Sequence, residues 1–167
     1  MADPYLHGGG IHIYPSQGKL NMHLDYSIHP ITKKERRINI IIYLNKIWED
    51  EWGGHLELWD NIENPTFIKR LNPEYNTAVI FQTSDGSYHG IPNKINCPSN
   101  FSRNSIAIYY VSEPRNNVKH RYKAKFFITN DKEKNDTRLK QLIEIRNNRR
   151  LTSKDLETIY PDWKEYF

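Results

Sequence analysis

The stretch KLNMHLDY at residues 19–26 places a histidine and an aspartate two positions apart. Successive side chains of a β-strand point to opposite faces, so residues two apart leave the strand on the same side. One strand can therefore present the His23 imidazole and the Asp25 carboxylate to a common point. Alone, this is a weak motif, because the same spacing occurs in surface turns and around buried structural histidines.

Three further stretches supply the partners that such a pair needs. They are RINIIIYLNKIW at 37–48, SDGSYHGIP at 84–92 and FSRNSIAIYY at 101–110. The second contributes His89 and the third contributes Arg103. Two imidazoles and one carboxylate form a metal-ligand set that leaves coordination positions open for other molecules.

Short segments rich in β-branched and aromatic residues, separated by Gly, Pro and Asn, predict a mainly β fold. We expect strands at 11–14, 19–26, 36–45, 55–60, 66–71, 77–82, 88–91 and 103–111. Eight short strands suit a double-stranded β-helix, or jelly roll. Strand alternation places Arg103, Ser105 and Ala107 on one face, and a closed interior would bring them near His23 and Asp25.

The pattern becomes helical after about residue 130. Leu139, Leu142 and Ile143 have helical spacing, and TSKD at 152–155 has the pattern of a capping box that starts a second helix. We therefore expect a double-stranded β-helix core at 1–130 and a C-terminal helical extension at 131–167 that packs on the same domain. Pro161 is expected to end the second helix.

Taken together, these motifs resemble the Fe(II)- and 2-oxoglutarate-dependent oxygenases, and among them the prolyl-4-hydroxylase-like branch. The resemblance runs from about residue 11 to about residue 111. It implies that His23, Asp25 and His89 bind iron and that Arg103 binds the distal carboxylate of 2-oxoglutarate. A bidentate guanidinium suits a carboxylate geometrically.

The resemblance also assigns three further residues to the co-substrate. Tyr43 matches a tyrosine whose hydroxyl shares the distal carboxylate, and Ser105 lies two residues past Arg103 on the same strand face. Tyr14 matches a tyrosine near the other end of the co-substrate. The implied reagents are Fe(II), 2-oxoglutarate and O₂, with ascorbate as a candidate reductant. The implied reaction hydroxylates a C–H bond and releases succinate and CO₂.

The substrate implied by this branch is a prolyl residue of a protein or peptide. The same chemistry on a lysyl side chain, a free amino acid or a nucleic acid remains an alternative. Nucleic acid is disfavoured, because the demethylase members of the family carry a second arginine six residues after the first, where this chain has Tyr109. A metal-binding jelly roll without turnover is the alternative from a different class. Tyr43 and Arg103 favour catalysis, since a pure metal binder does not need them.

Composition is consistent with one domain and excludes some classes. The chain has 167 residues, a formal net charge of +4 and a single cysteine, Cys97, so it has no internal disulfide. It has no apolar run near 18 residues and no leader pattern, so we expect a cytoplasmic protein without a membrane partner. Basic residues in the last third alternate with acidic ones, which favours a solvated helix surface over a nucleic-acid site.

The remaining histidines have no ligand-like partner at useful spacing. His12 is expected to be a hydrogen-bonded structural residue. Substrate choice is expected to depend on the loops 27–35, 48–54 and 93–102, which have no recognisable recognition motif. The sequence leaves the oligomeric state open.

Overall fold

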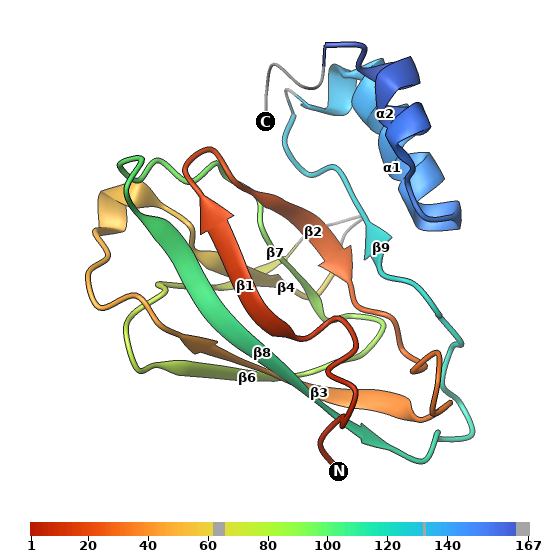
Figure 1. Ribbon diagram of the computed structural model, residues 1–167. Helices are drawn as coiled ribbons and strands as arrows, with labels where there is room; N and C mark the ends of the chain where they lie inside the picture. Colours follow the sequence, from red (N-terminus) through yellow and green to blue (C-terminus); the bar gives the residue numbers. More distant parts are fainter. Residues whose placement is uncertain (62–65, 132, 163–167) are drawn as a thin grey trace.

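The computed structural model describes residues 1–61, 66–131 and 133–162 (Figure 1). The last five residues of the expected C-terminal extension therefore lie outside the described part. The strands are β1 (Gly10–Pro15), β2 (Leu20–Leu24), β3 (Glu35–Tyr43), β4 (Leu56–Trp59), β5 (Phe67–Leu71), β6 (Ala78–Gln82), β7 (Tyr88–Ile91), β8 (Ser102–Ser112) and β9 (Lys125–Phe126). The helices are η1 (Asp50–Trp52), η2 (Glu133–Asn135), α1 (Thr137–Asn148) and α2 (Ser153–Ile159).

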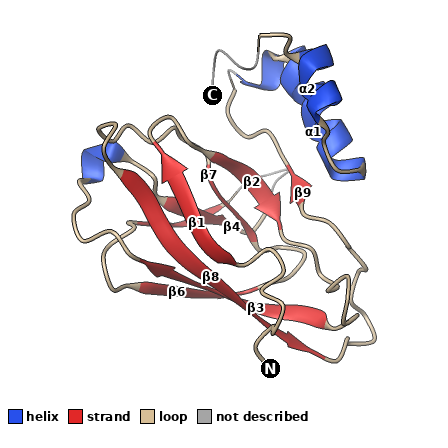
Figure 2. Cartoon of the chain, in the orientation of Figure 1, coloured by secondary structure: helices blue, strands red, loops and turns tan. Residues whose placement is uncertain are grey.

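Two antiparallel sheets make up the core of the molecule (Figure 2). One has the strand order β1-β8-β3-β6 and the other the order β5-β4-β7-β2-β9. Most successive strands alternate between the two sheets, which is the connectivity of a jelly roll. The predicted mainly β jelly roll with C-terminal helices is confirmed.

The two sheets enclose the main hydrophobic core. Ile41 and Tyr43 of β3, Val79 of β6 and Ala107 of β8 pack against Leu56 of β4 in the facing sheet. Fully burying a side chain of this size stabilises the fold by roughly 1.5–3 kcal/mol. Burial alternates strictly along β8 from Ser102 to Tyr110, so its inward residues form one continuous row. Arg103, Ser105 and Ala107 belong to this row, as the strand pattern predicts.

The outer face of the β1-β8-β3-β6 sheet is also apolar. Ile11 and Ile13 of β1 are 69% and 65% exposed, and Ile80 of β6 is 63% exposed. Ile40 lies between Ile80 and Ile108 in the strand register. Among the described strands the helix α1 contacts only β9, so the helices leave this face uncovered (Figure 1). Apolar patches of this kind are typical of association surfaces.

The helical segment is attached to the edge of the second sheet. The Asn147 side chain of α1 accepts a hydrogen bond from the Phe126 N–H at 2.8 Å and donates one to its carbonyl oxygen at 3.0 Å. It thus pairs with β9 as a strand would. Thr152 and Asp155 form the predicted capping box at the start of α2. No helix among the described residues is long and apolar enough to cross a membrane.

The eight predicted strand ranges each correspond to an observed strand, with ends shifted by up to two residues. The ninth strand, β9, was not predicted, because two residues show no periodicity. It pairs with the free edge of β2, where Phe126 lies opposite His23 in the strand register.

Replacing Leu56 by Ala is expected to lower the free energy of unfolding by about 2–5 kcal/mol, because it opens a cavity between the sheets. Ile68→Ala, at a position that is 58% exposed, is the matched control and should change it by no more than about 0.5 kcal/mol. Urea denaturation measures both values. Equal losses in the two variants would contradict the assignment of the core.

Candidate metal and co-substrate site

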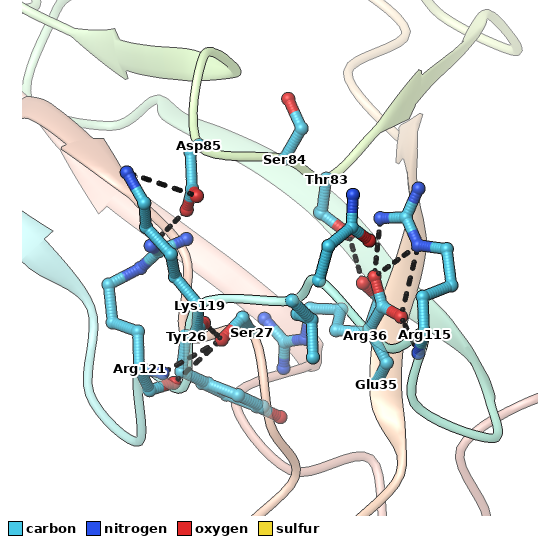
Figure 3. A pocket seen from close by; sticks show the side chains of 12 residues that line it. Tyr26, Ser27, Glu35, Arg36, Thr83, Ser84, Asp85, Arg115, Lys119 and Arg121 are labelled. Carbon is cyan, nitrogen blue, oxygen red and sulfur yellow. Dashed lines mark hydrogen bonds and ion pairs between the residues drawn. The ribbon is translucent and has the colours of Figure 1, made fainter.

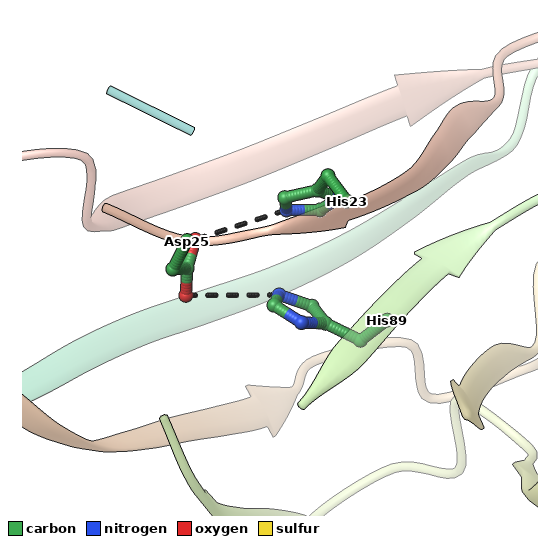
Figure 4. A group of neighbouring side chains, drawn as sticks. All are labelled: His23, Asp25 and His89. Carbon is green, nitrogen blue, oxygen red and sulfur yellow. Dashed lines mark ion pairs between the residues drawn. The ribbon is translucent and has the colours of Figure 1, made fainter. Parts of the chain in front are cut away.

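His23, Asp25 and His89 converge in the interior between two neighbouring strands (Figure 4). His23 of β2 lies directly opposite His89 of β7 in the antiparallel register, and their ring centroids are 4.3 Å apart. Asp25 follows immediately after the end of β2. One ligand atom from each of the three residues lies within 4.8 Å of the others. This spacing allows the three side chains to hold one metal ion.

Backbone carbonyls orient both imidazoles toward this point. The His23 Nδ1 atom lies 3.0 Å from the Asn21 carbonyl oxygen, and the His89 Nδ1 atom lies 2.9 Å from that of Ser87. A carbonyl oxygen only accepts hydrogen bonds, so each Nδ1 carries the proton and donates it. The Nε2 lone pairs are therefore free for a metal and face Asp25, each 3.7 Å from one of its carboxylate oxygens. Such partners fix the orientation of histidine ligands in metal sites.

The electrostatics of the group keep its ligands in metal-binding form. Burial and the neighbouring His89 lower the pKa of His23 to about 4, so its imidazole is neutral at pH 7. Burial opposes ionisation of Asp25, but His89 and Arg36 outweigh it and lower the pKa of the carboxyl below its usual value. A neutral imidazole at His23 and a carboxylate at Asp25 suit a divalent cation.

Two residues that the sequence analysis did not assign hold the Asp25 carboxylate. The Asn39 amide donates to Oδ2 of Asp25 at 3.3 Å, and the Arg36 guanidinium lies 3.5 Å from the same oxygen. Arg36 is 2% exposed and lies between the rings of Tyr26 and Tyr109. In the sequence, both residues stand out as polar side chains in a strand that is rich in isoleucine. The register irregularity of β3 between residues 36 and 38 explains why Arg36 also points inward.

A narrow cavity of about 50 Å³ extends from the two histidines to Arg103. Tyr14, Ser105 and His12 also line it. Tyr14 lies opposite Arg103 in the strand register, and its ring centroid is 5.7 Å from the guanidinium carbon. His12 was expected to be structural, yet its side chain lies along this cavity. Strand alternation predicts this position of His12, because His12 and Tyr14 are two residues apart and leave β1 on the same side.

Arg103 is a buried cation without an acidic partner. It is 2% exposed, and its Nε donates to the Gly54 carbonyl oxygen at 2.6 Å. No carboxylate among the described residues forms an ion pair with it. Gly54 has a φ of +73°, and a Cβ there would lie 3.1 Å from the Arg103 side chain, so this close approach favours glycine. An unpaired buried charge is costly, which indicates that the site is built for an anion.

Tyr43 supplies a second polar group at this end of the cavity. The Arg103 guanidinium carbon lies 4.9 Å from the centroid of its ring. The Tyr43 hydroxyl is buried and has no hydrogen-bond partner among the described residues. Burial raises the pKa of Tyr43, so the hydroxyl stays protonated and can donate to a carboxylate. The residues present therefore fit a divalent metal at one end of the cavity and a carboxylate of a small acid at the other.

A match to the sequence model of a known family establishes which family the chain belongs to. The model described as the 2OG-Fe(II) oxygenase superfamily matches residues 9–111, which is more than half of the chain. The chain belongs to the 2OG-Fe(II) oxygenase superfamily. Membership implies Fe(II), 2-oxoglutarate and O₂ as reagents, in agreement with the donor set of the cavity. The predicted resemblance to this family and to its prolyl hydroxylases is confirmed.

Three proteins to which the chain is similar are prolyl hydroxylases. The chain is 37% identical over 59 residues to prolyl 3-hydroxylase OGFOD1 of Mus musculus, covering 34% of this chain and 11% of the mouse protein. Among solved structures, a Pseudomonas putida prolyl-4-hydroxylase is 19% identical with a TM-score of 0.44, covering 62% of this chain and 51% of that one. A Trichoplax adhaerens prolyl hydroxylase, solved with a hypoxia inducible factor peptide fragment, is 23% identical with a TM-score of 0.46, covering 60% and 41%. The chain thus spans about half or less of the length of these relatives.

Metal affinity is expected to depend on Asn39 as well as on the ligands. Asn39→Ala should weaken Mn(II) binding roughly 10- to 100-fold, because the Asp25 carboxylate loses a hydrogen bond that orients it. Asp25→Ala should weaken it further, and Asn116→Ala on an exposed loop is the matched control. Calorimetric titration with Mn(II) measures all four proteins. Unchanged affinity in Asn39→Ala would show that the carboxylate needs no such support.

The stability of the metal-free protein is expected to fall as the pH decreases from about 6.5 to about 4. The pKa of His23 is about 4 in the folded state and has its ordinary value of 6.5 in the unfolded state. In this window the unfolded chain binds a proton that the folded chain does not, so acid favours unfolding, by about 3 kcal/mol in total. Urea denaturation in EDTA at several pH values tests this, and His23→Gln should flatten the dependence. An unchanged slope in that variant would refute the assignment.

Proposed function

We propose that this chain is a Fe(II)- and 2-oxoglutarate-dependent dioxygenase that hydroxylates a C–H bond of a prolyl residue in a protein or peptide, with succinate and CO₂ as co-products. The observation that carries the proposal is the cavity itself. A three-ligand group lies at one end, and a buried arginine without an acidic partner lies at the other. A co-substrate with a metal-binding end and a distal carboxylate matches both.

In this proposal His23, Asp25 and His89 hold the metal, while Asn39 and Arg36 keep the Asp25 carboxylate in place. Arg103 and Tyr43 bind the distal carboxylate, with Ser105 and Tyr14 beside them. Bound iron supplies the redox chemistry that couples 2-oxoglutarate decarboxylation to hydroxylation. The protein's part is to orient the co-substrate and to keep water away from it, which the nearly complete burial of these side chains favours. Ascorbate is proposed as a reductant that keeps the iron in the Fe(II) state.

The prolyl substrate is proposed from the mouse relative, a prolyl 3-hydroxylase that is 37% identical over the aligned residues. The same site chemistry would serve a lysyl side chain or a free amino acid. A metal-binding protein without turnover is the contrasting possibility. A protein that only binds metal would not need the buried, unpaired charge of Arg103, and for that reason we favour the enzyme.

Succinate formation from 2-oxoglutarate tests the reaction. With Fe(II), O₂ and ascorbate, the wild-type chain should form succinate slowly on its own and faster with a pool of proline-rich peptides. His23→Ala should abolish the activity. Arg103→Ala should raise the 2-oxoglutarate KM by about 30-fold or more, because it removes a buried charged partner of the carboxylate.

The exposed Arg138→Ala variant is the control and should match the wild type. Metal binding without 2-oxoglutarate binding or turnover would reject the enzyme and leave the metal-binding protein. Turnover that survives His23→Ala would place the reaction elsewhere in the molecule.

We also propose that residues 131–167 belong to the same domain as residues 1–130. The Asn147 side chain pairs with the Phe126 backbone, and the Phe126 ring stacks on His23 with ring centroids 5.0 Å apart. Deleting residues 136–167 should therefore lower the melting temperature and weaken Mn(II) binding. Asn147→Ala should do so partially, with the exposed Asn148→Ala as control. A truncated chain with unchanged metal affinity would show that the extension is independent.

A further inference from the structure

A second cavity, of about 310 Å³, opens on the aspartate side of the metal-ligand group. Its lining includes Asp25, Tyr26, Tyr109, Tyr122, Lys123 and Arg146. Tyr109 also lines the co-substrate cavity, so the two spaces adjoin at the ligand group. A molecule in this second cavity would lie beside Asp25, the one residue of the ligand group that does not line the co-substrate cavity. No role is yet assigned to this space.

Two of the cations that line it, Lys123 and Arg146, have no acidic partner among the described residues. Lys123 donates from Nζ to the Arg146 carbonyl oxygen at 3.0 Å, and the Arg146 guanidinium carbon lies 4.8 Å from the centroid of the Phe126 ring. Within the described residues, neither side chain forms an ion pair with a carboxylate. Burial, Arg146 and Arg149 lower the pKa of Lys123, as expected where positive charges gather.

A neighbouring polar cavity provides the contrast (Figure 3). There Arg115 pairs with Glu35 at 2.5 Å, and Arg121 pairs with Asp85 at 2.6 Å. Lys119 also lies within 3.9 Å of Asp85. Each of these three cations lies beside an acid of the chain itself, with Asp85 shared by two of them, so this cavity offers less to a negatively charged ligand. The positive charges of the second cavity, in contrast, can bind a negatively charged ligand.

The walls of the second cavity are aromatic and in part rigid. Tyr26 and Tyr109 are buried, and they hold the Arg36 guanidinium carbon 3.5 and 3.2 Å from their ring centroids. Tyr122 is 51% exposed and stands at the opening. Aromatic grooves accommodate proline-containing, extended peptides well. The cavity thus combines a surface for such a peptide with a site for a negative charge.

We propose that this cavity binds the substrate, and that it selects a peptide in which an acidic side chain lies close to the residue that is hydroxylated. The peptide carboxylate binds Lys123 and Arg146, and the tyrosines contact the segment that reaches the metal. The inference rests on the proposed function, whose peptide substrate it specifies. Nucleic acid fits less well, because its affinity requires a track of several phosphate contacts, whereas this opening has two cations.

Binding of three labelled peptides tests the proposal. They share a central proline and differ only in the residues on either side of it, which are Glu, Gln or Lys. Fluorescence anisotropy is measured with the full chain, Mn(II) and 2-oxoglutarate. The Glu peptide should bind roughly five- to tenfold more tightly than the Gln peptide at low salt, and high salt should reduce the difference. The Lys peptide should bind most weakly.

Variants connect the preference to the two cations. Lys123→Gln with Arg146→Gln should remove the preference, and Lys123→Glu with Arg146→Glu should reverse it. Arg150→Glu with Lys154→Glu makes the same change in net charge on exposed residues outside the cavity and should keep the preference. Mn(II) affinity, measured in each variant, confirms that the fold is intact.

Equal binding of the three peptides, or a preference that survives both cavity variants, would overturn the proposal. So would a single-stranded oligonucleotide that competes better than the Glu peptide and depends on the same two residues. Succinate formation in the same samples separates the two claims. Turnover without an acidic preference keeps the proposed function and rejects this inference. An acidic preference without turnover keeps the cavity assignment and contradicts the oxygenase.

Discussion

The close approach of β2 and β7 is the constraint on which the site depends. A Cβ at Gly90 would lie 2.7 Å from the Leu20 carbonyl oxygen, so the two strands can come this close only with glycine at that position. This approach sets His23 opposite His89 and lets strand carbonyls orient both rings. Asp25 then follows at the end of the same strand. A larger residue at position 90 would separate the strands and with them the ligands.

The charges in the interior show what the fold is arranged to do. Burying charge is unfavourable unless it is paired, and most buried ions of this chain are paired. Asp25 lies beside Arg36, and Glu35 binds Arg115. Arg103 is the exception among the buried arginines of the described chain, since no carboxylate there pairs with it and its Nε donates to a backbone carbonyl. A dicarboxylate co-substrate would supply the missing charge, so stability and co-substrate binding are linked through one residue.

The fold could be predicted from the local periodicity of the sequence, and the family resemblance indicated that His23, Asp25 and His89 would lie together, as they do. His23 lies at the end of β2 with Asp25 just beyond it, and Arg103 and Ser105 are two apart on β8, so each pair stays close together in the jelly roll. The contact of Arg36 with Asp25 could not be predicted, because Arg36 turns inward only through a register irregularity. The second cavity brings together residues 7–8, 25–26, 122–124 and 146, and only tertiary packing makes them neighbours. The loops 48–54 and 93–102, which are expected to govern substrate choice, contribute Trp48, Trp52 and Ile95 to a second hydrophobic cluster, and this packing also could not be predicted from the sequence.

The most direct test of the account is calorimetric titration of the Mn(II)-loaded chain and its Arg103→Ala variant with 2-oxoglutarate and with pyruvate. Pyruvate has the same keto acid but lacks the distal carboxylate. If the cavity binds the co-substrate between the ligand group and Arg103, the variant loses affinity for 2-oxoglutarate about 30-fold or more and keeps its affinity for pyruvate. Equal losses for the two acids, or binding of 2-oxoglutarate that is indifferent to both metal and Arg103, would contradict the account.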